Sequence, residues 1–234
     1  MARVILQPVF VLHTKSFRDT SLLVDLFTLQ YGRVSTIARG VRSAKSKSRG
    51  LLLPFVPLLA SWSGKTELMT LGKVEANGSA YNLLGKNLLS GFYLNELLVR
   101  LLARHDPHPD IFNVYQNTLN NLQNIKDVQI TLRLFEKQLL AKIGYGLQLT
   151  KDVHDNPITA DQYYYYEHER GFIKCQKDLN TNTQNMFSGD NLLAFHNNKF
   201  KDVSALREIK FLMRLIFDHL LDNKPLKSRE LVNK

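Results

Sequence analysis

The chain is 234 residues long, 44% of them apolar, and has a formal net charge of +10 at pH 7. This length and apolar content suffice for a buried core, which excludes a disordered tail, and no apolar run approaches the roughly 20 residues that span a bilayer. The single cysteine, Cys175, excludes an intrachain disulfide and a zinc site built from several cysteines. The first apolar run is interrupted at Gln7 and Pro8 and lacks a small-residue cleavage site, so we expect a first strand there and a cytoplasmic protein without a membrane partner.

The positive charge is concentrated in the first third of the chain. Residues 1–80 contain eleven basic and four acidic residues, a net charge of +7, whereas the remainder has a net charge of +3. No acidic residue lies between Asp25 and Glu67, and most of the basic residues there surround a flexible Ser- and Gly-rich stretch at 40–50. A cluster of positive charges without negative ones suits binding of a polyanion such as a nucleic-acid backbone. The alternative is a basic loop that is only solvated and binds no partner. The seven basic residues are Arg33, Arg39, Arg42, Lys45, Lys47, Arg49 and Lys65.

Five short segments before residue 75 have the pattern of β-strands. Pro8 places the first at a sheet edge or a break, and Val34, Thr36 and Ala38 share one face of the third. Five strands with no helix-length pattern between most of them predict a small barrel or half of a sandwich. A barrel of the OB type, whose open face commonly binds single strands, fits the count. The expected strands are 4–12, 21–29, 33–38, 51–62 and 67–74.

Beyond residue 80 the apolar residues recur at helical spacing. We expect helices at 88–102, 111–125 and 128–143, and a long last helix with Asp202 as its N-cap. Residues 149–188 interrupt this period and contain four consecutive tyrosines, which indicates a small β-containing insertion between the helices of one bundle. The predicted fold class is therefore α+β.

No motif in the chain indicates an active site. Gly64-Lys65-Thr66 resembles part of a phosphate-binding loop, but that loop needs a glycine where Leu59 stands and a helix afterwards, so a hairpin turn is the better interpretation. His168 lies between two glutamates, yet no second histidine stands at the usual ligand spacing, which argues against a metal site. We therefore expect no enzyme and no cofactor, and binding remains as the function.

The candidate binding residues are cations and aromatic side chains. The clustered cations of the first third would neutralise phosphates. Tyr31 and Trp62 lie near strand ends or turns, where a base could stack on them, but each is equally compatible with the core. Three cations share one face of the last helix, which is typical of a solvated face and also suits an acidic peptide with an apolar end. These three are Arg207, Lys210 and Arg214.

Several blocks of the sequence, in order and at family-like spacing, resemble the bacterial RecO family of recombination mediators over essentially the whole chain. In the first third these blocks are FVLHTKSFRDTSLLVDLFTLQYGRVSTIARGVRSAKS, GLLLPFVPLL and ELMTLGKVE. Later blocks are YLNELLVRLL, LRLFEKQLLAKIGYG, YYEHERGF and KPLKSREL. The ordered set is more specific than any single motif considered above.

The resemblance implies an OB-fold at 1–79 and a helical domain at 80–234, interrupted at 149–188 by a zinc-ribbon-like insertion. Many members of the family have two CxxC pairs in this insertion, whereas Cys175 stands alone here. We therefore expect no metal, and an insertion that is held together by packing with its tyrosines as contributors.

The resemblance also implies a function without nucleotide hydrolysis. Members bind single- and double-stranded DNA, anneal complementary strands and, with RecR, help RecA to replace the single-strand-binding protein (SSB), a role exercised at the nucleoid. They also bind the acidic, apolar-ended C-terminal tail of SSB through the helical domain, and to this tail we assign the three cations of the last helix. To DNA we assign Arg33, Arg39, Arg42, Lys45, Lys47, Arg49 and Lys65.

Three other functions stay open from the sequence. The nearest is an RNA-binding OB protein of translation, which would prefer RNA over DNA. A phosphate-transferring enzyme would turn over nucleotides. A protein-interaction adaptor would bind RecR or SSB while its N-terminal domain ignored DNA.

Overall fold

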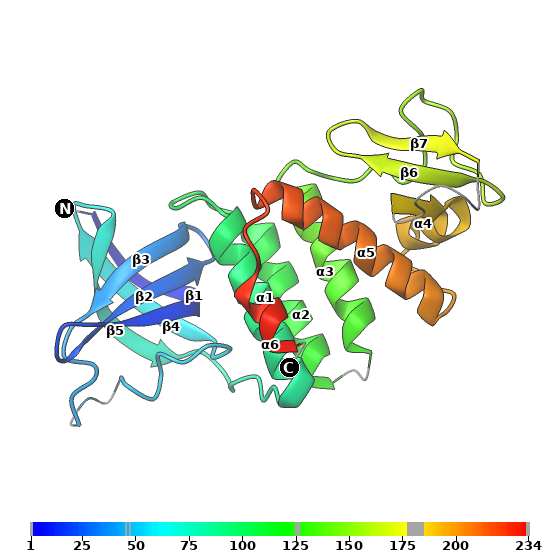
Figure 1. Cartoon of the computed structure of the whole chain (residues 1–234). Coiled ribbons are helices and arrows are strands. Elements are labelled where there is room, and N and C mark those ends of the chain that lie inside the picture. Colours follow the sequence, from blue (N-terminus) through cyan, green and yellow to red (C-terminus); the bar gives the residue numbers. More distant parts are fainter. Residues whose placement is uncertain (1, 45, 47, 125–126, 177–184, 233–234) are drawn as a thin grey trace. The chain divides into compact units, whose positions relative to one another are not determined.

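The structure is a computed structural model that describes residues 2–44, 46, 48–124, 127–176 and 185–232 (Figure 1). The chain divides into two compact units, residues 1–126 with 226–234 and residues 127–225. The division expected at residues 79 and 80 separates strands from helices rather than these units, and as a domain boundary it stays a prediction. Among the described residues, no helix combines the length and the apolar character needed to cross a membrane.

The first unit contains a closed five-stranded barrel with the strand order β1-β2-β3-β5-β4 (Figure 1). Strands β3 and β5 pair in parallel, and all other neighbours pair in antiparallel. The predicted α+β class with an OB-type barrel is confirmed. The strands are β1 (Ala2–Phe17), β2 (Ser21–Thr28), β3 (Gly32–Ala38), β4 (Leu58–Gly64) and β5 (Leu68–Ala76).

Strand β1 contains the irregularity expected around Pro8, although the strand does not end there. The register against β4 shifts between Val4 and Gln7, where Leu6 has a φ of +43°. The amide of Leu6 donates to the hydroxyl of Ser61 at 3.0 Å, so its hydrogen-bonding capacity is satisfied from the neighbouring strand. The strand therefore bends through a bulge and continues along the barrel.

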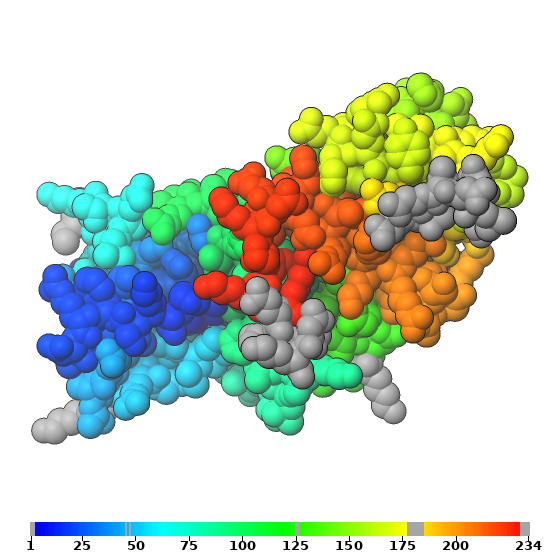
Figure 2. Space-filling view, in the orientation of Figure 1, coloured from blue at the N-terminus to red at the C-terminus, as the bar shows by residue number. Residues whose placement is uncertain are grey.

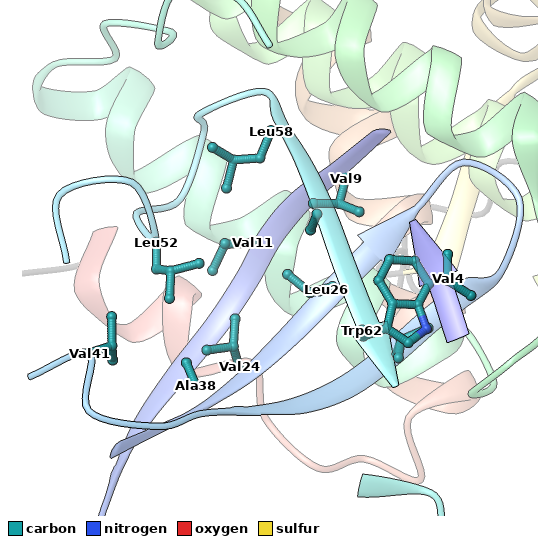
Figure 3. Packing of buried hydrophobic residues seen from close by; sticks show 12 residues of the cluster. Val4, Val9, Val11, Val24, Leu26, Ala38, Val41, Leu52, Leu58 and Trp62 are labelled. Atoms are coloured by element: carbon teal, nitrogen blue, oxygen red, sulfur yellow. The ribbon is translucent and has the colours of Figure 1, made fainter. Parts of the chain in front are cut away.

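Aliphatic side chains at alternate strand positions fill the barrel (Figure 3). Val34, Thr36 and Ala38 are buried, as the alternation along β3 predicts. The connection from β3 to β4 contributes Val41 and Leu52, which lie together at one end of this core (Figure 3). The predicted strand at 51–62 begins later than expected, because residues 51–57 form turns.

Three helices complete the first unit: α1 (Gly85–Leu101), α2 (Pro109–Asn124) and α6 (Lys227–Val232). The first two match the helices predicted from apolar spacing, whereas α6 was not predicted. The carboxylate of Glu96 on α1 accepts hydrogen bonds from the amides of Lys227 and Ser228 at 2.9 and 2.8 Å. This contact satisfies two amides at the start of α6 and holds the C-terminal segment on α1.

The outer face of β1 and β2 is covered by α1 and α2. Phe10 of β1 contacts Phe112 and Tyr115 of α2, with ring centroids 5.3 and 5.2 Å apart. Asn95 of α1 donates to the carbonyl of Leu12 at 3.0 Å and accepts from the Tyr115 hydroxyl at 2.6 Å. Strands β1 and β2 are thus buried on both faces, by aliphatic residues inside the barrel and by aromatic residues outside it.

Gly32, the first residue of β3 directly after the β2–β3 turn, is expected to tolerate no side chain. It has a φ of +63°, and a Cβ placed on it would lie 2.1 Å from the Asp106 carbonyl oxygen. Gly40 is a matched control, because its φ is +66° and a Cβ there would meet nothing within 4 Å. We expect Gly32→Ala to lower the free energy of unfolding by about 1 to 3 kcal/mol more than Gly40→Ala, measured by chemical denaturation. Equal losses would contradict the close packing of the turn on the residue 106 loop.

The second unit combines helices with a small antiparallel sheet of order β7-β6-β8. Asp202 accepts a hydrogen bond from the Ala205 amide at 2.8 Å, which confirms the predicted N-cap of the last long helix. The predicted helix at 128–143 and the β-containing insertion are also present, whereas α4 was not predicted. The elements are α3 (Val128–Lys142), β6 (Tyr163–Glu167), β7 (Gly171–Cys175), β8 (Met186–Ser188), α4 (Gly189–His196) and α5 (Val203–Leu220).

The insertion is held together by packing and hydrogen bonds. Tyr164, Phe172 and Phe187 are at most 1% exposed, and the Asp152 carboxylate accepts bonds from the amides of His154 and Asn156. Burial acts to raise the pKa of Asp152, but the hydrogen bond from the Asn156 side-chain amide and these two backbone hydrogen bonds lower it overall. The residues present do not fit a zinc ribbon, because the chain has one cysteine and the described residues contain no group of three or more metal-ligating side chains.

Candidate nucleic-acid interface

Four exposed cations gather at one end of the barrel: Lys15, Arg18, Arg39 and Arg42, here called the basic rim. The β1–β2 hairpin turns at this end, since Phe17 pairs with Ser21. The last residue of β3 lies beside it, since Ala38 pairs with Leu22. The strand pairing therefore places residues 15–18 next to residues 39–42, although some twenty positions of sequence separate them.

One backbone and one side-chain hydrogen bond connect the two halves of the basic rim. The Arg42 amide donates to the Thr20 carbonyl at 2.8 Å, and the Arg42 guanidinium donates to the Arg18 carbonyl at 3.1 Å. Val41, between the cations, is only 3% exposed. Within the part of the chain that the structure describes, no rim side chain forms an ion pair with a carboxylate. The rim is therefore held in place by hydrogen bonds, and its positive charges are available to bind an anion.

The remaining cations of the β3–β4 connection follow the basic rim along the chain. Arg49 is exposed, while Lys45 and Lys47 lie outside the described residues. The stretch predicted to be flexible contains successive turns, with the Ser43 amide donating to Gly40 and the Ser46 amide to Ser43.

Lys65 lies at the other end of the barrel. It is exposed in the β4–β5 turn, and its neighbour Gly64 pairs with Ala2, at the start of β1, whereas the basic rim lies at the end of β1. The structure therefore does not bring Lys65 into the rim. A nucleic-acid strand that contacts both Lys65 and the basic rim must run along the length of the barrel.

The two aromatic candidates contact each other near Lys65 but differ in exposure. Their rings are 5.5 Å apart and perpendicular. Tyr31 is 40% exposed, whereas Trp62 is 4% exposed and lies in the barrel core beside Val4 (Figure 3). Of the two alternatives that the sequence left open, the structure places Trp62 in the core, and Tyr31 alone presents its ring to solvent.

Arg33 is turned toward α1 rather than toward solvent. Its guanidinium donates to the Val99 carbonyl at 2.5 Å. Burial lowers the pKa of Arg33, an effect that Asp25 opposes and Arg104 reinforces. Arg33 is thus the least accessible described member of the predicted DNA-binding set and joins β3 to the helices.

The outer face of β2 and β3, which OB-folds commonly use for oligonucleotides, is only partly open. Phe27 of β2 packs on Phe112 of α2, with ring centroids 5.4 Å apart, so the helices cover that part. The uncovered part continues into the basic rim, since Leu23 pairs with Lys15 on one side and with Ile37 on the other. The part of this face that the helices leave open therefore lies toward the basic rim.

The three cations assigned to a peptide lie on the exposed side of α5, opposite the buried stripe of that helix: Arg207, Lys210 and Arg214. The Arg214 side chain lies 3.4 Å from the Asp218 carboxylate on the next turn. The spacing predicted from the sequence is therefore present as a row of cations.

The basic rim suits phosphate binding, because its exposed guanidinium and ammonium groups make charge-assisted hydrogen bonds to anionic oxygens. Lys15 and Arg18 belong to a strand end and a hairpin turn, outside the cation cluster of residues 33–65. A paired-strand prediction for β1, β2 and β3 is the signal that would have joined them to Arg39 and Arg42.

Comparisons with known proteins give a consistent result for both parts of the chain. Residues 1–80 match the family model described as Recombination protein O N terminal, and residues 85–230 match Recombination protein O C terminal. A DNA repair protein RecO of Coxiella burnetii is 50% identical over 231 residues, covering 98% of each chain. Its namesake in Nitrosococcus oceani is 43% identical over 234 residues, covering 99% of this chain and 94% of its own. That of Methylococcus capsulatus is 41% identical over 231 residues, covering 98% and 93%.

Proposed function

The chain belongs to the RecO family of DNA repair recombination mediators, and on that premise we propose that it binds and anneals DNA through the basic rim. In this proposal it binds single- and double-stranded DNA and, with RecR, promotes the loading of RecA onto DNA coated by SSB. It acts at the nucleoid, in the cytoplasm, and catalyses no reaction. The observation that supports it is the anchored cluster of rim cations without carboxylate partners among the described residues.

Annealing makes a specific demand on such a surface. Two polyanions must approach each other, so a cationic surface has to reduce their repulsion while the base edges stay free to pair. Contacts to phosphates hold the backbones and leave the edges accessible. Exposed arginines and lysines on the barrel meet this demand, with Arg49 and Lys65 as further phosphate contacts along the path.

The row of cations on α5 is proposed to bind the acidic tail of SSB. Arg207, Lys210 and Arg214 would contact the carboxylates of the tail. This contact would bring the protein to coated DNA, where the basic rim then engages the released strand.

The test is annealing of two complementary oligonucleotides, one of them coated with SSB, at two salt concentrations. We expect annealing that weakens as salt rises, persists on the coated strand and fails when the SSB tail is deleted. Arg207→Glu/Lys210→Glu should reduce annealing of the coated strand about tenfold while leaving naked strands unaffected; Lys199→Glu, an exposed charge reversal elsewhere in the same unit, is the control.

Other outcomes would redirect the proposal. Annealing that ignores the tail would keep the DNA role and remove the peptide site on α5. A strong preference for RNA in competition would favour the RNA-binding alternative. No annealing at either salt concentration would leave an adaptor function.

A further inference from the structure

The second unit contains a cavity of about 550 Å³ that none of the functions above uses. Three segments line it: residues 145–148 after α3, the β6–β7 hairpin, and the end of α5. In Figure 2 the hairpin appears in yellow-green and α5 in orange. Its volume lies within the range of small-molecule sites, and its walls mix aromatic rings with a few polar groups.

Aromatic rings dominate one side of this cavity. The imidazoles of His168 and His219 stack, with centroids 4.2 Å apart and planes 17° from parallel. Tyr166 meets His168 edge-on at 5.4 Å. Tyr145 is 57% exposed and also lines the cavity, so a large ring is available to an incoming ligand. Stacked rings of this kind are extended readily by another flat ring.

The charged side chains that line the cavity have nearby polar partners. Arg170 pairs with Glu167 at 2.8 Å, and Glu169 faces His219 at 3.8 Å. Burial and the neighbouring His219 lower the pKa of His168, an effect that Glu169 opposes, so the shift favours the neutral imidazole. A phosphate would find no uncommitted cation among these lining residues, whereas an uncharged ring with hydrogen-bonding edges would suit both the rings and the polar groups.

We propose that this cavity binds an unpaired nucleobase of a single strand, stacked on the Tyr145 and histidine rings. The inference rests on the proposed DNA-binding function and adds to it a second contact of different chemistry. The basic rim holds phosphates, and the cavity holds a base. Gln148 and Glu169 supply an amide and a carboxylate for the edge of the base.

The two contacts respond differently to salt and to the removal of bases. Phosphate contacts weaken steeply as salt rises, because they release counterions. Stacking of a base on an aromatic side chain releases no counterion. An oligonucleotide of abasic sites retains the phosphates and lacks the rings. It therefore measures the rim alone, and an ordinary oligonucleotide measures the rim and the cavity together.

The experiment measures the affinity of the full chain for ordinary and for abasic oligonucleotides of equal length. We expect Tyr145→Ala and His219→Ala each to weaken binding of the ordinary strand about five- to 100-fold, with no change for the abasic strand. Tyr165→Ala is the matched control, since Tyr165 is 38% exposed on β6 but does not line the cavity. Equal losses on both strands, or none on the ordinary strand, would overturn the proposal.

A second measurement separates this inference from the proposed function. Free thymidine and adenosine are titrated into the full chain, and the imidazole resonances of His168 and His219 are followed by NMR. Saturable shifts of these resonances, absent for ribose 5-phosphate, support a base site even if the chain fails to bind oligonucleotides. Oligonucleotide binding without any nucleoside-dependent shift keeps the DNA function and rejects the cavity as a base site.

Discussion

Charge reversal at Arg39 and Arg42 is expected to weaken binding of single-stranded DNA by about 25-fold or more at 0.1 M salt. Both residues are exposed members of the basic rim. On single strands, log K falls as log salt rises, and each lost phosphate contact makes this slope less steep by about 0.7. Two lost contacts therefore account for about 1.4 log units of affinity over one decade of salt. Fluorescence anisotropy titrations of Arg39→Glu/Arg42→Glu at several salt concentrations measure both the affinity and the slope.

The control for this experiment is Lys86→Glu, which changes an exposed lysine in the first turn of α1. An acidic residue at a helix N-terminus is favourable, so the control should fold at least as well as the parent chain. We expect its DNA affinity to stay within about threefold of the parent, because Lys86 is not among the residues assigned to phosphate contacts. An unchanged salt slope in the rim variant, with folding intact by circular dichroism, would remove the basic rim as the DNA contact.

Phe10→Ala is expected to lower the free energy of unfolding by about 3 to 5 kcal/mol. Phe10 is 1% exposed and lies on the outer face of the barrel, where its ring contacts Phe112 and Tyr115 of α2. Removing the ring leaves a cavity between the barrel and the helix, and the barrel should then unfold together with α2. Chemical denaturation followed by far-ultraviolet circular dichroism and by Trp62 fluorescence measures the loss and tests whether the two transitions coincide.

Ile5→Ala is the matched control in the same strand, because Ile5 is 61% exposed. A substitution at such a surface position should change the free energy of unfolding by at most about 0.5 kcal/mol. If Phe10→Ala costs no more than Ile5→Ala, or if the fluorescence transition of the barrel precedes the loss of helix, then the barrel folds independently of α1 and α2.

Features that depend on neighbouring residues could be predicted from the sequence alone. The cap at Asp202 needs only local geometry, because an N-terminal carboxylate acts within a few residues. The apolar periods of α1, α2 and α3 predicted these helices to within a few residues. The ordered sequence blocks identified the family, and the run of cations from Arg39 onward indicated a polyanion.

Which of the predicted residues are exposed depends on contacts between segments that lie far apart in the sequence. Arg33 and Arg39 lie on the same charged stretch, yet Arg33 donates to the Val99 carbonyl of a helix far along the chain while Arg39 is exposed. Trp62 lies in the barrel core because strand pairing places its side chain inward, which alternation in an irregular segment does not reveal.

The same reason applies to the cavity of the second unit. His168 and His219 stack at 4.2 Å although fifty positions of sequence separate them. Local patterns report on periodicity within one element, whereas a site between a hairpin and a helix depends on how their side chains pack against each other. Packing between distant segments is the part of this protein that its sequence patterns do not encode locally.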